Sequence, residues 1–90
     1  MSNDTLLELV KLDLQLLTNA FDALVLQDID AAKEYIAREG ITLGDTAGDA
    51  QLVVMYAAYL YRQRVNPDNK MPRMLRWELN KRLFAQKAGG

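Results

Sequence analysis

The side chains that carry most enzyme chemistry are missing from this chain. It has 90 residues with no histidine and no cysteine, which removes the usual zinc and haem ligands and leaves Asp, Glu and Lys for acid–base work. Asp28 and Asp30 lie two residues apart, so their carboxylates point to different faces of a helix. Gly40 and Gly44 lack the lysine and the spacing of a phosphate-binding loop. We therefore expect no enzyme, metal or cofactor, and a function in non-covalent binding.

The side chains best suited to binding gather in the last third of the chain. From residue 62 to residue 90 there are eight basic residues and two acidic ones, a net charge of +6. The basic residues are Arg62, Arg64, Lys70, Arg73, Arg76, Lys81, Arg82 and Lys87. Such a segment can contact a DNA backbone without reading its sequence, or dock on the acidic half of an identical neighbour.

The formal net charge of −1 hides a division of charge between the two halves of the chain. Residues 1–45 hold nine acidic and three basic side chains, whereas residues 46–90 hold three acidic and eight basic ones. This division suggests a charged partner surface, a polyanion, or an identical neighbour that meets the opposite end. An ordinary solvated surface is the alternative.

The elements that position these side chains are helices. Half of the residues are hydrophobic, and they recur at helical spacing over the whole length. The pattern predicts an all-α fold, a compact bundle of about four helices in a single domain over residues 1–90. The helices are expected at approximately 5–14, 20–39, 47–65 and 72–86, with a disordered tail at 87–90.

Within the second helix, Asp28 falls inside an otherwise apolar stripe. One interpretation is a carboxylate at the edge of the stripe that reaches water. The other is a partly buried acid paired with Arg62 or Arg64, which burial would require.

The third helix has no polar face in the ten residues Leu52–Tyr61. Three other helices can hardly surround it, so we expect one side to meet another subunit. Alternatively, the hydroxyls of Tyr59 and Tyr61 reach water at the edge of the bundle. Ten apolar residues are about half of a membrane span, and the first residues lack the basic region of a signal peptide. We therefore expect a soluble protein made in the cytoplasm, without membrane contact.

The fourth helix has two apolar faces. A leucine stripe suited to the interior consists of Leu75, Leu79 and Leu83. Trp77 and Phe84 lie on the opposite side, flanked by Arg73 and Lys81. Large aromatic residues beside arginine are typical anchors of protein interfaces. They can also stack on nucleic-acid bases or belong to one wide core face, and the sequence leaves the three interpretations open.

Several segments, in their order along the chain, carry a family resemblance. They are Val10–Leu14, Asn19–Asp22, Ala31–Ile36 with Glu39–Ile41, Leu52–Arg64, and Met71–Arg76 with Leu79–Phe84. Together they resemble the small head–tail connector (adaptor) proteins of tailed phages and prophages, which are also described as phage DNA-packaging proteins. The resemblance covers about residues 5–85 and depends mainly on the tyrosine-rich third helix followed by Met71-Pro72-Arg73. The family has no short functional motif, so no residue role is carried over.

The resemblance implies a virion structural protein without catalytic activity. Members of the family are all-α subunits that form a homo-oligomeric ring, about a dozen copies, below the portal of a filled capsid. The ring extends the DNA channel and joins the head to the neck or tail. The implied partners are the portal protein, a downstream neck or tail-completion protein, and packaged double-stranded DNA that passes through without sequence-specific binding. The implied location is the head–tail interface of the virion, after synthesis in the host bacterial cytoplasm.

Two sets of residues are the candidate contact sites. We expect a subunit interface at Tyr56, Tyr59, Tyr61, Trp77 and Phe84. We expect contact with a portal, or with the DNA channel, at Arg62, Arg64, Arg73, Arg76, Lys81 and Arg82. The alternative function is a small helical nucleic-acid-binding or regulatory protein, with the basic residues of the fourth helix on phosphates.

Overall fold

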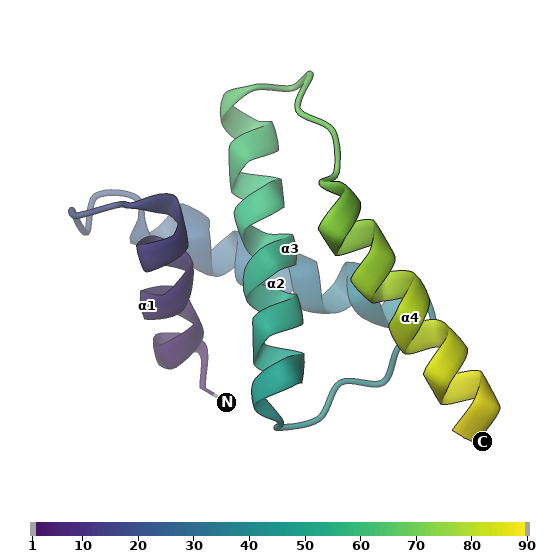
Figure 1. The fold of residues 1–90 in the computed structure, drawn as a ribbon. Coiled ribbons are helices and arrows are strands. Elements are labelled where there is room, and N and C mark those ends of the chain that lie inside the picture. The colour runs from purple at the N-terminus through teal and green to yellow at the C-terminus, as the bar shows by residue number, and fades with distance from the viewer. Residues whose placement is uncertain (1, 90) are drawn as a thin grey trace.

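The computed structural model describes residues 2–89 and consists of four α-helices, with no strand in that part of the chain. They are α1 (Asn3–Leu14), α2 (Asp22–Arg38), α3 (Ala47–Val65) and α4 (Arg73–Gly89). Helix α3 stands in the centre, α1 and α4 lie on opposite sides of it, and α2 crosses behind (Figure 1). The predicted all-α fold is confirmed.

Local hydrogen bonds decide where the helices begin. The Ser2 hydroxyl accepts from the backbone N–H of Thr5 at 3.3 Å, so Ser2 caps α1 and the helix begins two residues before its predicted start. The Thr46 hydroxyl accepts from the N–H of Asp49 at 3.1 Å and begins α3 at its predicted position. Helix α2 begins at Asp22 rather than at residue 20, because residues 18–21 form a bend followed by a turn.

The last turn of α4 differs from the prediction of a disordered tail at 87–90. The helix continues through residues 87–89, and Gly90 lies outside the described residues. Gln86 explains this extension, since its amide nitrogen donates to the carbonyl of Gly40 at 2.6 Å and its oxygen accepts from the N–H of Thr42 at 2.9 Å. Gly40 has a φ of +96°, a conformation that favours glycine at the end of α2.

Helix α3 is covered by its own chain far more completely than expected. It packs against α1, α2 and α4, and six of the ten residues in Leu52–Tyr61 are buried. Met55, Tyr59, Leu60 and Tyr61 are half-buried. Ala57 and Ala58 are fully buried, and their small side chains let neighbouring helices approach closely. Three helices thus cover most of this stretch, and the four half-buried residues remain its partly exposed side, so the expected contact of α3 with another subunit stays a prediction.

The core-facing side of α4 agrees with the predicted leucine stripe. Leu75 and Leu79 are fully buried, and Leu83 packs half-buried against the same core. Burial of two leucines at this spacing fixes which face of α4 turns toward α3, and it leaves the opposite face outward. No helix of the described residues is long and apolar enough to cross a membrane.

Candidate interaction surfaces

Most of the basic residues predicted to meet a portal or DNA are paired inside the chain. The ion pairs are Arg62–Asp13, Arg64–Asp28, Arg76–Glu39 and Arg82–Asp49. Three of these four pairs join the basic half of the sequence to the acidic half. Many of the opposite charges of the two halves are thus paired within one subunit, because the helix packing brings the halves into contact.

Asp28 is a buried acid with one partner. It is 4% exposed, and its Oδ1 accepts from Nη2 of Arg64 at 2.7 Å. Its Oδ2 is buried without a hydrogen-bond partner among the described residues. The hydrogen bond from Arg64 to Asp28, and then the charge of that carboxylate, raise the pKa of Arg64. The interpretation of Asp28 as a partly buried acid paired with Arg64 is confirmed.

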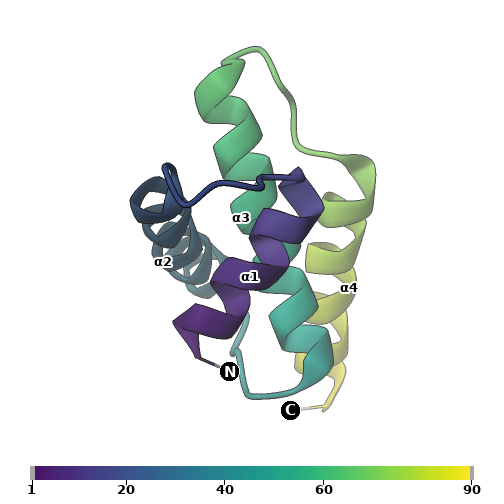
Figure 2. The same ribbon diagram turned by 90° about the vertical axis from the view of Figure 1, so that its left-hand side faces the viewer.

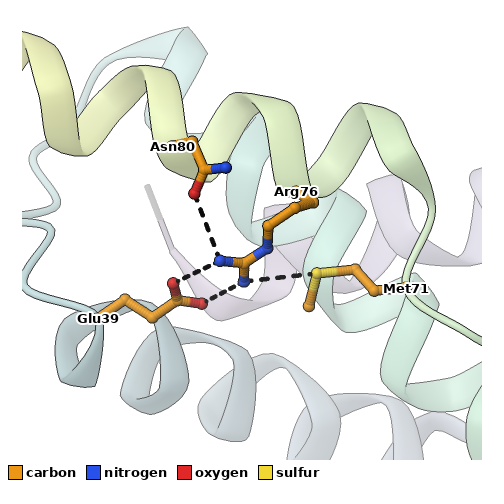
Figure 3. Close-up of polar contacts among 4 residues, drawn as sticks. All are labelled: Glu39, Met71, Arg76 and Asn80. Atoms are coloured by element: carbon orange, nitrogen blue, oxygen red, sulfur yellow. Dashed lines mark hydrogen bonds and ion pairs between the residues drawn. The ribbon is translucent and has the colours of Figure 1, made fainter.

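Arg76 joins the start of α4 to the end of α2 (Figure 3). Its Nη1 donates to Oε1 of Glu39 at 3.0 Å and its Nη2 donates to Oε2 at 2.8 Å, a two-pronged pairing. Nη2 also lies 3.6 Å from Sδ of Met71, and Nη1 lies 3.5 Å from Oδ1 of Asn80. The hydrogen bonds to Glu39 raise the pKa of Arg76 despite its partial burial. Arg76 therefore positions α4, and its guanidinium is already paired and less available to bind a polyanion.

Asp49 forms a second polar link between α4 and the rest of the fold. Its carboxylate is buried, accepts from the N–H of Gly44 at 2.7 Å and pairs with Arg82. Burial acts to raise the pKa of Asp49, but the hydrogen bonds from Arg82 and Gly44 outweigh it and hold that pKa below its ordinary value of 3.8. The ionised form of Asp49 is therefore the form that the fold stabilises.

Asp49→Asn is expected to lower the free energy of unfolding by about 1 kcal/mol at neutral pH, because Arg82 loses its charged partner. Since the folded-state pKa lies below 3.8, the Asp49 carboxylate stabilises the fold above pH 3.8, and this contribution is lost as the pH falls through the folded-state value. Urea unfolding from neutral pH to about pH 2 should therefore show a smaller loss of stability in the variant than in the wild type. Equal losses in both proteins would show that Asp49 does not contribute in this way.

The five aromatic residues predicted for one interface are divided by the fold into two groups. Tyr56 is buried, stacks on Tyr35 at a ring distance of 6.0 Å and meets Tyr59 edge-on at 6.1 Å. Burial, followed by the nearby charge of Glu39, raises the pKa of the Tyr56 hydroxyl. Tyr56 is thus part of the core, with Tyr59 and Tyr61 half-buried at its margin. Of the three tyrosines, we retain only Tyr59 and Tyr61 as residues that a partner can reach.

Trp77 and Phe84 form a different surface on the outer side of α4. They are 56% and 77% exposed, and Met74 beside them is also exposed. Lys81 lies over the Trp77 ring with Nζ at 4.8 Å from its centre, and Arg73 is exposed at the start of the helix. The interpretation of one wide core face is therefore wrong. We call this surface, made of Met74, Trp77 and Phe84 with Arg73 and Lys81, the α4 ridge.

A second exposed apolar surface, which the sequence analysis missed, lies on α1 and the segment after it. An open groove of about 710 Å³ is lined by Glu8, Lys11, Leu12, Gln15, Leu16, Leu17 and Asn19. Leu12 is 73% exposed and Leu17 almost entirely so. A helical wheel of residues 3–14 would have placed Leu12 opposite the buried Leu6 and Val10. We call this surface the α1 groove.

Lys11 does not make the α1 groove basic. Its Nζ is bound to Oδ1 of Asn19 at 2.8 Å and to Oδ1 of Asp22 at 3.0 Å, and the residue is buried.

Among residues 2–89, no group of three or more acidic side chains is placed to hold a metal ion. Comparison of the chain with models of protein families, with curated proteins and with solved structures finds no match.

Proposed function

We propose that this protein is a structural subunit of a phage virion, a head–tail connector that forms a ring below the portal. In this role it extends the DNA channel and joins the head to the neck or tail. The observation that carries the proposal is the α4 ridge, two large aromatic side chains held outward by a helix whose leucine face is buried. The resemblance over residues 5–85 gives the ridge its context, since connector subunits must bind one another and two neighbouring components.

The composition of the α4 ridge supports a protein partner. Tryptophan, other aromatic residues and arginine contribute most of the binding energy in many protein interfaces. Contiguous exposed apolar side chains mark interaction sites. The cation–π contact between Lys81 and the Trp77 ring already places a basic side chain beside an exposed aromatic one before any partner binds. The portal protein and a neck or tail-completion protein are the further partners that the connector role requires.

The alternative, a small helical nucleic-acid-binding or regulatory protein, has less support. Such a protein needs several cations free to neutralise phosphates. Arg62, Arg64, Arg76 and Arg82 are already paired with carboxylates, which reduces the charge available to a polyanion. A connector channel needs DNA to pass without tight binding, and this distribution of charge suits that need.

Native mass by light scattering over a wide range of protein concentration, with and without duplex DNA, tests the proposal. We expect a defined large oligomer that forms without DNA and appears as closed rings by electron microscopy. A monomer that binds duplex DNA tightly at physiological salt, with affinity that falls steeply as salt is added, would contradict the connector and support the alternative.

A further inference from the structure

Helices α1 and α4, which carry the α1 groove and the α4 ridge, lie on opposite sides of the central helix α3 (Figure 1), and the turned view shows α1 in front of α3 (Figure 2). We propose that the α4 ridge of one copy docks into the α1 groove of the next copy, so that identical subunits join head to tail. The proposal rests on the proposed connector function and assigns its subunit contact.

The two surfaces match in apolar shape. The α4 ridge presents Trp77 and Phe84 as projecting side chains, and the α1 groove offers about 710 Å³ of open space lined by Leu12, Leu16 and Leu17. Aromatic anchors that fill a pocket on the partner are the usual centre of a stable protein interface. Docking would remove from water the large apolar side chains of both surfaces, which are otherwise a cost to a protein in solution.

The two surfaces are also opposite in charge. Arg73 and Lys81 flank the ridge, and the ion pair of the exposed Lys81 with the half-buried Glu78 is long at 3.8 Å. Glu8 lines the groove, and Lys11 in the same groove is neutralised by Asp22. The groove therefore keeps its negative side chain at the place where a basic ridge would dock. Complementary charge at the rim of an interface favours the correct partner and orientation.

Symmetry distinguishes this arrangement from the simpler pairing of two identical surfaces. Two α4 ridges placed together would bring the basic Arg73 and Lys81 of one copy against the same basic pair of the other, and two α1 grooves would bring two Glu8 side chains into one interface. Only ridge against groove joins unlike charges. Because such a contact leaves one ridge and one groove free at the ends, it repeats, and it closes into a ring when the rotation between subunits permits.

Mixing two single variants tests the docking directly. Leu12→Asp disables the groove and Trp77→Asp disables the ridge, so each variant alone is expected to be monomeric. An equimolar mixture retains one intact ridge and one intact groove, and it should therefore form a 1:1 dimer that grows no further, as seen by native mass spectrometry. Val65→Asp is the matched control, since Val65 and Leu12 are both 73% exposed, and it should assemble like the wild type.

Several outcomes would overturn the docking. They are a Leu12→Asp variant that assembles like the wild type, a mixture that stays monomeric, and a wild-type chain that stays monomeric at millimolar concentration. Phe84→Asp provides a second ridge variant, and circular dichroism checks that each variant is folded. Glu8→Lys and Lys81→Glu should each weaken assembly at least tenfold. Their 1:1 mixture should recover assembly beyond a dimer, because both ridge–groove contacts between unlike variants then join opposite charges; no recovery would also count against the docking.

The docking and the connector function fail in different ways. A wild-type ring that tolerates Leu12→Asp removes the docking and leaves the connector in place. A mixed 1:1 dimer from a chain whose wild type forms only open filaments supports the docking and contradicts the ring.

Discussion

Arg64→Met is expected to lower the free energy of unfolding by about 3 kcal/mol, measured by urea denaturation at neutral pH. The substitution keeps a long unbranched side chain but removes the one hydrogen-bond donor to the Asp28 carboxylate among residues 2–89. Asp28 is 4% exposed and its Oδ2 already has no partner in the described residues, so an uncompensated charge remains inside the protein. This value lies at the low end of the range for breaking a buried ion pair. The Arg64 side chain is 40% exposed, so water can enter the space that it vacates and partly solvate the Asp28 carboxylate.

The double variant Asp28→Leu/Arg64→Met is the matched control for this effect. Replacing a buried ion pair by apolar side chains of similar volume is often neutral or stabilising, because no charge then has to be desolvated. We expect the double variant to recover most of the stability that Arg64→Met loses. A double variant as unstable as the single one would show that Arg64 acts through packing of its stem rather than through its charge.

Leu79→Ala is expected to lower the free energy of unfolding by about 3 kcal/mol and to loosen α4 before the other helices. Leu79 is fully buried, so its loss removes apolar contact and leaves a cavity. The apolar attachment of α4 consists mainly of Leu75 and Leu79, with Leu83 half-buried. Of the other three helices, α4 packs chiefly on α3. Polar links such as Arg76–Glu39 add less to stability than burial of a leucine does.

Hydrogen exchange of the backbone amides shows which helices lose stability in Leu79→Ala. Faster exchange confined to α4 is the expected pattern, because weakly attached elements open separately from the core. Met74→Ala serves as the control, since Met74 is exposed on the same helix and its truncation should change stability by less than about 0.5 kcal/mol. Equal acceleration in all four helices of Leu79→Ala would mean that α4 unfolds only with the whole domain.

The loosening of α4 also connects stability to the proposed assembly. Leu79 is buried and lies outside the α4 ridge, but it holds the helix that carries Trp77 and Phe84. Leu79→Ala should therefore weaken assembly without touching the interface, whereas Met74→Ala removes an apolar side chain of the ridge without weakening the fold.

Short-range signals in the sequence predicted the helices well. The bounds of α3 follow from Thr46 at its start and from Asn66-Pro67 after its end, since a cap and a proline act within a few residues. The start of α1 and the last turn of α4 were predicted less well. Ser2 was the closer cap in the first case, and in the second Gln86 reaches residues 40 and 42, which no local pattern reveals.

Three features could be predicted from the amino-acid sequence: the helical fold, the lack of histidine and cysteine side chains, and the two apolar faces of the fourth helix. Each of these follows from residue type or from the 3.6-residue period of a helix, which operates over a few turns. The outward position of Trp77 and Phe84 is the consequence of Leu75 and Leu79 turning inward.

Which charged side chains remain unpaired, and which surfaces can meet a partner, depends on how the helices pack together. Arg64 and Asp28 are 36 residues apart, and Arg76 and Glu39 are 37 apart. Arg64 meets Asp28 because α2 packs directly on α3, and Arg76 meets Glu39 because α2 and α4 both pack on α3. Many of the opposite charges of the two halves are therefore paired inside the fold. In the same way the burial of α3 and the opening of the α1 groove depend on how helices cross, and the crossing is set by the packing of all four helices together.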